Sequence, residues 1–485
     1  MAGYRVPLII RGKIIEGPEV KFGGRGGSAE FTTPDVKLHL DKLALTTPSA
    51  LADLYGQSFE QILDFLAALG EKLSFKHNTY LQEAFELSRH TSGLGDEILR
   101  HHYQTLHAFF DRTMLREMVD RTLGIPYLEG WVGGRLAGGG SAAVRAFGAR
   151  AVHIVAGNVP GVSAISIARN AVTRSDAIVK SPSNDPLTAA AIARTMVDMA
   201  PDHPTTRHLA VAYWKGGDQE VESRLYQPRN IEKIIAWGGL ASITHIAKYI
   251  QPGIDLITLD PKLSSTIIGR EAFSADAVMR DVAERLANDV GVFNQEACVN
   301  ARVVYIETGT HAEGIAKANR FGAMLYEAIQ ALPSHTSGPA KSLHRELADE
   351  VETLKFAGDS HQVVGGGVNG GVIISQIEEP VDFSRLLANR FANLVPVDSL
   401  ETPIRAVNAY TQTIGIYPES LKAEVRDRLA FHGAQRIVSL GYAARPVLAG
   451  PQDAIEPLRR MCRWIMDETC DPADVPMPSR TAAES

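Results

Sequence analysis

The stretch AVHIVAGNVPG, residues 151–161, decides which fold the sequence predicts. It begins with a short β-branched run, turns through a loop of Gly, Asn and Pro, and leads into a segment that can form a helix, 162–173. Further apolar runs of strand length lie at 177–179, 209–213, 231–236 and 254–259, with helical patterns between them. Short apolar strands that alternate with helices predict a parallel sheet with right-handed crossovers. Such sheets bind ligands at the carboxyl ends of their strands.

A second alternation follows the first. Its helices are expected at 275–287 and 313–332, and its strands at 302–307 and 372–376. The region before residue 150 is mainly helical in pattern after a β-like entry at 6–15, and the glycine-rich stretch 133–141 predicts a loop. Near the end of the chain, 453–469 is predicted as a helix, followed by a Pro-rich tail.

Length and composition limit the possible classes of protein. The chain has 485 residues, which suggests about two or three large domains. A formal net charge of -7 gives no indication of a nucleic-acid or anionic-membrane partner. No apolar run approaches the roughly 20 residues that span a bilayer, and we expect no signal peptide. The three cysteines, Cys298, Cys462 and Cys470, argue against a disulfide framework and indicate the cytoplasm.

Cys298 lies in a polar loop, VFNQEACVNAR at 292–302, between a predicted helix and a predicted strand. A thiolate is a strong nucleophile and a good leaving group from an acyl carbon, so this position suits transient acylation. The alternative is that Cys298 is a small buried hydrophobe. For Cys462 and Cys470, which lie on or after the helix predicted near the end of the chain and have no polar constellation around them, the buried role is preferred. The histidines between 101 and 107 lack ligand spacing, and no metal site is predicted.

Three further loops follow predicted strands of the first sheet. Asn158 can donate its amide hydrogens to a developing oxyanion, although Gly, Asn and Pro also form ordinary turns. Lys180 and Ser181 end the second strand, where a lysine can bind ribose hydroxyls or a 2′-phosphate. Because no acid stands at this strand end to favour NAD, the pattern favours NADPH. The alternative role for Lys180 is that of a solvated lysine at a strand end. Gly238 and Gly239 follow the fourth strand and could bring backbone N–H groups near a pyrophosphate.

In this order, these segments resemble the aldehyde dehydrogenase superfamily, and within it the acyl-CoA reductases of the LuxC type, the long-chain fatty-acyl-CoA reductase family. The resemblance covers 6–15 and, more strongly, 152–306, and its most specific motif is FNQ at 293–295 with Cys298 and Arg302. It implies an α/β fold with a Rossmann-type coenzyme domain, an α/β catalytic domain and a small oligomerisation arm. It also implies a homodimer or homotetramer.

The domain boundaries expected from the resemblance are 1–262 for the helical region and NAD(P)-binding domain, with the β arm near 125–150. The catalytic domain is expected at 263–445, and a C-terminal helix and tail at 446–485. The resemblance implies that Cys298 is the nucleophile and that Asn158 and the Cys298 backbone N–H form the oxyanion hole. It assigns Lys180, Ser181, Gly238 and Gly239 to the cofactor site.

The reaction implied is the NADPH-dependent reduction of an acyl-CoA, by default a fatty acyl-CoA, to an aldehyde through an acyl-Cys298 intermediate. The acyl group could instead be bound to a carrier protein. Hydrolytic members of the superfamily have a water-activating glutamate where this chain has Thr258, unless a shifted alignment places Asp260 there. Glu296 is expected to point away from the thiol. The alternatives are a non-acylating aldehyde dehydrogenase and a cysteine-dependent acyltransferase that uses no nicotinamide.

Overall fold

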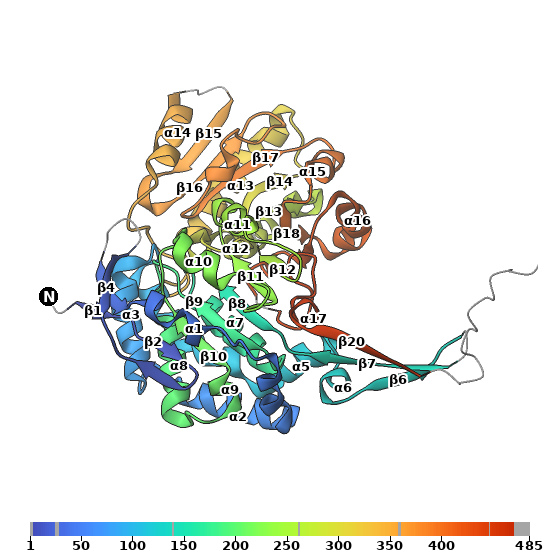
Figure 1. Cartoon of the computed structure of the whole chain (residues 1–485). Helices are drawn as coiled ribbons and strands as arrows, with labels where there is room; N and C mark the ends of the chain where they lie inside the picture. The colour runs from blue at the N-terminus through green and yellow to red at the C-terminus, as the bar shows by residue number, and fades with distance from the viewer. Residues whose placement is uncertain are drawn as a thin grey trace, which may run out of the picture.

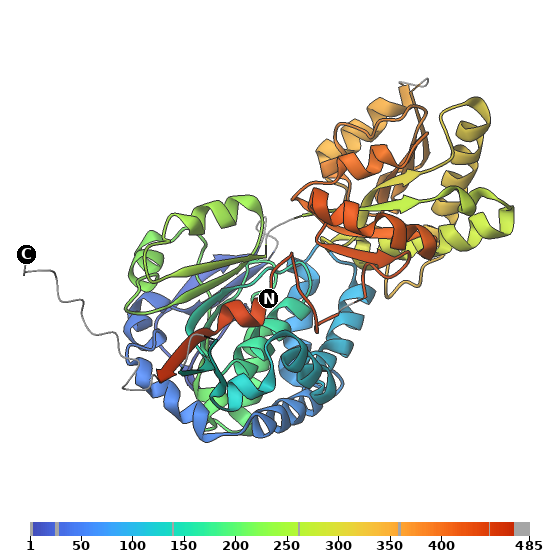
Figure 2. The ribbon, with the colours of Figure 1, turned by 90° about the vertical axis from the view of Figure 1, so that its right-hand side faces the viewer.

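The computed structural model describes residues 3–24, 29–137, 140–259, 262–356, 360–445 and 447–469. Its two large sheets lie in two lobes, the first sheet with the N-terminal helices in the lower part of Figure 1 and the second sheet in the upper part. Figure 2 shows the lobes side by side, with the last, red segment of the chain running from the second lobe back to the first.

The first sheet confirms the predicted parallel arrangement. Its parallel strands are β8 (Arg150–Ile154), β9 (Asp176–Lys180), β10 (Leu209–Ala212), β11 (Lys233–Trp237) and β12 (Asp255–Leu259). Two antiparallel strands, β2 (Leu8–Ile10) and β3 (Lys13–Ile15), extend the sheet to the order β12-β11-β8-β9-β10-β2-β3. Strand order reverses between β8 and β11, and ligands bind doubly wound sheets at such a switch point.

Helices cover both faces of this sheet. One face packs on α2 (Phe59–Lys72), α3 (Thr79–Thr91), α4 (Asp96–Thr105), α5 (Arg112–Thr122), α7 (Gly161–Val172) and α8 (Thr188–Met199). The other packs on α1 (Leu40–Leu43), α10 (Gln219–Leu225) and α11 (Leu240–Ala247). Local sequence sets the helix ends: Ser58 accepts from the Gln61 N–H and Gln61 bonds back to the Ser58 N–H, a capping box that starts α2. The shorter elements are β1 (Tyr4–Arg5), β4 (Glu19–Gly23), β5 (Glu30–Pro34), α6 (Ile125–Glu129) and α9 (Pro204–Arg207).

The second sheet has the order β15-β16-β17-β14-β13-β18-β19. Its strands are β13 (Leu263–Ile268), β14 (Ala301–Ile306), β15 (His361–Gly365), β16 (Gly371–Ser375), β17 (Phe391–Pro396), β18 (Thr411–Tyr417) and β19 (Arg436–Ser439). Its helices are α12 (Asp276–Gly291), α13 (Ala312–Gln330), α14 (Arg345–Phe356), α15 (Glu401–Ala406) and α16 (Glu419–His432). All its strand pairs are parallel except β15 with β16, and the predicted alternation is confirmed.

A third sheet corrects two predictions. The predicted helix at 453–469 is wrong: a short helix, α17 (Pro457–Met461), is followed by the strand β20 (Arg463–Thr469). β20 pairs antiparallel with β7 (Ser141–Phe147), from Arg463 opposite Phe147 to Thr469 opposite Ser141. β7 also pairs with β6 (Val132–Arg135), so the predicted loop at 133–141 is partly strand. Pairing with a distant strand overrides the local pattern in both segments. The three strands extend away from the lobes at the right of Figure 1.

Among the described residues, no helix has the length and apolar character needed to cross a membrane. The same part of the chain contains no group of three or more His, Cys, Asp or Glu side chains placed to hold a metal ion.

The link between β7 and β8 gives a stability prediction. A Cβ on Gly148 would lie 1.8 Å from the carbonyl oxygen of Arg174, a backbone atom that cannot turn aside. Gly148→Ala is therefore expected to cost about 1–3 kcal/mol and to lower the thermal unfolding midpoint measured by calorimetry. The matched control is Gly134→Ala in β6, where a Cβ would meet nothing within 4 Å. Equal midpoints for the two variants would contradict the crowding at Gly148.

Candidate active site

The two large sheets meet end to end at the predicted cysteine loop. Asn158 follows the carboxyl end of β8, and the loop that contains Cys298 precedes the amino end of β14. The side-chain Nδ2 of Asn158 donates to the backbone carbonyl of Glu296 at 3.2 Å. The structure therefore brings together the two residues for which the sequence predicted an oxyanion hole and a nucleophile.

The backbone just before the cysteine is strained. Phe293, Asn294 and Gln295 have φ angles of 59°, 50° and 64°, in the left-handed region that side chains disfavour. Gln295 holds this turn in place, because its Nε2 donates to the carbonyls of Ala301 and Phe391, both at 2.8 Å. Its Oε1 accepts from the Phe391 N–H at 3.0 Å. The buried glutamine thus ties the loop to β14 and β17.

Asn300 closes the loop on its other side. Its Oδ1 accepts from the Ala297 N–H at 3.1 Å, and its Nδ2 donates to the carbonyls of Asp289 and Val292 at 3.1 and 3.0 Å. Asn300 is fully buried, so these bonds are shielded from water. The cysteine between Ala297 and Asn300 is therefore held on a rigid turn.

Cys298 itself is partly buried and contacts the amino ends of two strands. Its Sγ accepts a hydrogen bond from Nε2 of Gln412, in β18, at 3.2 Å. Its backbone carbonyl accepts from the hydroxyl of Ser264, in β13, at 2.7 Å. Burial raises the pKa of the Cys298 thiol, and the negative charge of Asp453 raises it further. The Gln412 hydrogen bond and the positive charge of Arg302 act in the opposite direction.

The other cysteines differ. Cys462 is 2% exposed, and burial raises its pKa to about 12, so it is chemically inert in the folded chain. Cys470 lies outside the described residues.

The predicted cofactor residues lie at the carboxyl ends of β9 and β11. Lys180 is partly buried, with Nζ 5.8 Å from the Tyr213 ring centre and 5.7 Å from the Trp214 ring centre. Burial lowers its pKa to about 8, so the ammonium form still predominates at neutral pH. The Ser181 side chain is fully buried. Gly239 is the N-cap of α11 and Gly238 precedes it, so the first N–H groups of that helix lie next to this pair.

Two departures from the superfamily pattern have different outcomes. The Glu296 carboxylate is directed toward the N-terminal helices, with Oε1 3.7 Å from the position that a Cβ on Gly93 would take. Thr258 is partly buried near the carboxyl end of β12, next to its last residue, Leu259. Asp260, the alternative carboxylate, lies outside the described residues.

Sequence reasoning missed Gln412 and Asp453. Gln412 lies 114 residues from the cysteine that it contacts, and Asp453 fell within a segment that was predicted as a helix. Neither residue belongs to a motif with a known spacing, so no local signal could have identified it.

Comparison with known proteins decides the family. A family model described as Acyl-CoA reductase (LuxC) matches residues 54–464. The chain belongs to this acyl-CoA reductase family. The predicted resemblance is confirmed, and the chain is an enzyme of the oxidoreductase class.

Relatives of this LuxC-family chain include two long-chain acyl-protein thioester reductases. The one from Vibrio harveyi is 25% identical over 96% of this chain and 93% of the relative. The one from Photorhabdus luminescens is 31% identical over 67% of this chain and 65% of the relative.

Solved structures confirm the aldehyde dehydrogenase fold. The NADP-dependent glyceraldehyde-3-phosphate dehydrogenase from Bacillus halodurans, complexed with NADP, superposes with a TM-score of 0.72 at 12% identity, over 96% of this chain and 99% of that one. Lactaldehyde dehydrogenase from Escherichia coli gives a TM-score of 0.71 at 14% identity, over 97% and 100% of the two chains.

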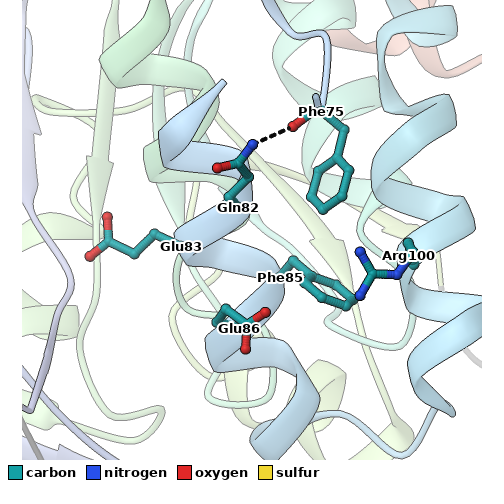
Figure 3. Close-up of a pocket in the computed structure, with 6 residues that line it drawn as sticks. All are labelled: Phe75, Gln82, Glu83, Phe85, Glu86 and Arg100. Atoms are coloured by element: carbon teal, nitrogen blue, oxygen red, sulfur yellow. Dashed lines mark hydrogen bonds between the residues drawn. The ribbon is translucent and has the colours of Figure 1, made fainter. Parts of the chain in front are cut away.

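A separate surface cavity of about 400 Å³ lies among the N-terminal helices of this LuxC-family chain. Figure 3 shows its lining, in which Gln82 donates to the Phe75 carbonyl at 3.0 Å and the Arg100 guanidinium lies 4.6 Å from the Phe85 ring centre. The remaining lining residues are Glu83 and Glu86. The cavity shares no residue with the Cys298 site, and its lining residues include no Cys, Ser, Thr or His.

The environment of Cys298 predicts how its thiol titrates. Only the thiolate reacts with iodoacetamide, and burial with the Asp453 charge disfavours the thiolate. We expect slow alkylation of Cys298 at pH 7, rising with pH through a midpoint above the ordinary value of about 8.5. Peptide mass spectrometry at each pH measures the rate, and Cys462 should stay unlabelled until the chain is denatured. A midpoint below 8.5 would contradict this reading of the site.

Proposed function

We propose that the chain reduces an acyl thioester to an aldehyde with NADPH, through a thioester intermediate on Cys298. The observation that supports this most directly is that the Asn158 side-chain amide donates to the backbone carbonyl of Glu296, two residues before Cys298, at 3.2 Å. The acyl donor is proposed as acyl-CoA or a carrier-protein thioester, with a fatty acyl group. The family is described as an acyl-CoA reductase family, and the two relatives are named for an acyl-protein thioester substrate, so both kinds of donor are proposed.

In the proposed first step, the Cys298 sulfur forms a bond to the acyl carbon, and the bond to the sulfur of the carrier breaks. The negative charge that develops on the carbonyl oxygen is held by the Asn158 side chain and the Cys298 backbone N–H. The Asn158 Nδ2 carries two hydrogens, of which one bonds to Glu296 and the other remains for the oxyanion. The proton of the thiol leaves with the carrier thiol, so charge and atoms balance.

When bound, the reduced nicotinamide supplies a hydride to the acyl carbon. Asn158 and the Cys298 backbone N–H again hold the charge on the oxygen. The carbon–sulfur bond then breaks, the aldehyde leaves, and the Cys298 thiolate regains a proton. Thr258 cannot act as a general base in its neutral form, so we expect slow attack by water on the intermediate.

The residues at the carboxyl ends of β9 and β11 fit an NADPH site. Lys180 ends β9 in the place where an acid would exclude a 2′-phosphate, and its ammonium group would hold that phosphate. Ser181 follows Lys180 and would contribute to the same subsite. The Gly238–Gly239 turn and the start of α11 would hold the pyrophosphate with backbone N–H groups. NADP is bound in the Bacillus halodurans neighbour, which has the same fold.

For the assembly, we propose residues 1–262 as the coenzyme-binding part, 263–445 as the catalytic part and 446–485 as a C-terminal segment. The two seven-stranded sheets and the chain crossing between β12 and β13 support this division. The homodimer or homotetramer and the cytoplasmic location stay predictions.

The decisive experiment for the proposed function tests Cys298. Mass spectrometry of the protein incubated with a panel of acyl-CoAs and acyl-carrier proteins should show an acyl mass on the Cys298 peptide, followed by aldehyde release with NADPH. Cys298→Ser should lose both the label and the turnover, while Cys462→Ser keeps them. Turnover by the Cys298→Ser variant would refute the assignment of Cys298 as the nucleophile. Formation of an acid from an aldehyde and NADP⁺ in the absence of coenzyme A would identify an oxidising dehydrogenase. A lack of NADPH binding would identify an acyltransferase.

A second variant tests the oxyanion hole. Asn158→Ala removes the side-chain donor and should lower kcat by about 10²–10³ with little change in KM, because the oxyanion exists only in the transition state and the tetrahedral intermediate. Asn230→Ala is the control, since the Asn230 amide also donates to a backbone carbonyl, but in a loop at the other end of the sheet. Near-normal kcat in Asn158→Ala would remove Asn158 from the mechanism.

A further inference from the structure

One side-chain amide bridges the reactive sulfur and a carboxylate from the end of the chain. The Nε2 of Gln412 lies 3.2 Å from the Cys298 Sγ and 2.6 Å from the Asp453 Oδ1. Gln412 is only 4% exposed, so both contacts are largely shielded from water. Its two amide hydrogens are thereby directed to two acceptors, one of which is the atom that we propose to carry the acyl group.

Asp453 reaches this position on a tight turn. Gln452 and Ile455 form an isolated antiparallel bridge, and the two residues between them, Asp453 and Ala454, have φ angles of 52° and 60°. Left-handed geometry at both central positions is that of a type I′ turn, which favours Asn, Asp and Gly and is costly for alanine. The Gln452 Oε1 accepts from the buried Arg169 of α7 at 2.9 Å. The turn is therefore held by the first lobe while its carboxylate faces the cysteine of the second.

The charge on Asp453 decides which end of the Gln412 amide faces the sulfur. An ionised carboxylate only accepts hydrogen bonds, so it must face the NH₂ group and not the carbonyl. The Gln412 Oε1 is then directed elsewhere, and it is buried with no hydrogen-bond partner among the residues that the structure describes. Leaving that oxygen unsatisfied costs free energy, and the bond to a charged acceptor offsets it. Without Asp453, the amide could turn and present its carbonyl to the thiol.

Charged groups from three elements interact electrostatically with the Cys298 thiol. Asp453 comes from the C-terminal turn, Arg302 from β14 and Arg436 from β19. Arg302 is buried and its Nε donates to the Leu387 carbonyl at 2.8 Å, so its position is fixed. The carboxylate disfavours the thiolate by its charge, and it favours the thiolate by the way it orients Gln412. Only the second effect requires Gln412.

We propose that Asp453 is a positioning residue, which holds the Gln412 amide with its NH₂ group on the Cys298 sulfur, and that Gln412 is the donor that stabilises this sulfur as a thiolate. The C-terminal turn at 452–455 thus completes the active site from a segment outside both large sheets. The inference depends on the proposed function only in taking Cys298 as the nucleophile.

The test is a double-mutant cycle read on the thiol. The pH midpoint of Cys298 alkylation by iodoacetamide is measured in the wild type, Gln412→Leu, Asp453→Ala and the double variant. Gln412→Leu should raise the midpoint by about one pH unit, since it removes a donor to the thiolate. Asp453→Ala should lower the midpoint by at least about 0.4 pH unit more in the Gln412→Leu background than in the wild type, because the orientation of the amide is lost only when Gln412 is present.

An equal effect of Asp453→Ala in both backgrounds would overturn the proposal, since it would show that the carboxylate acts through charge alone. An unchanged midpoint in Gln412→Leu would also overturn it. Asp453→Asn removes the charge but keeps an acceptor oxygen, and should show a weaker coupling to Gln412 than Asp453→Ala.

Glu456→Gln is the matched control. It removes a charge from the same segment, at a residue whose carboxylate pairs with Arg459, and it should leave the Cys298 midpoint unchanged. Protection of Cys462 from alkylation reports that each variant is folded. The assay needs no acyl substrate. The coupling between Gln412 and Asp453 can therefore be absent although acyl transfer to Cys298 is found, or present although acyl transfer is not found. The two proposals are therefore tested separately.

Discussion

The turn at Phe293–Gln295 is the constraint on which the candidate active site depends. Three consecutive residues other than glycine have left-handed backbone conformations, each of which costs free energy. The cost is offset by Gln295, whose buried amide bonds to the backbone of two neighbouring strands. Because the chain is turned in this way, Cys298 lies just before the amino end of β14, outside any helix or strand.

That position lets side chains from distant parts of the chain converge on one sulfur. Asn158 comes from the carboxyl end of the first sheet, Gln412 from the amino end of β18, and Asp453 from the last turn before α17. No single lobe contains all of these groups. The site is completed only when the chain returns from the second lobe to the first, as the red segment does in Figure 2.

The return of the chain to the first lobe also explains why the helix predicted at 453–469 is wrong. Residues 463–469 have no alternation strong enough to predict a strand, yet they pair along their whole length with β7. A strand needs a partner, and the partner here lies more than 300 residues earlier in the sequence. The isolated bridge between Gln452 and Ile455 was missed for a different, local reason: Asp453 and Ala454 are not the glycines that usually mark such a turn.

The sequence by itself determined the alternation of strands and helices, the parallel sheets and the polar loop around Cys298. These features depend on residues near one another in the chain, whose periodicity and turn propensities act locally. Only the tertiary structure decided which side chains face the sulfur. The Gln412 and Asp453 contacts arise from strand order and from the path of the C-terminal segment. Neither contact produces a pattern among residues that are close together in the sequence. Contacts of this kind are set by the packing of the whole chain.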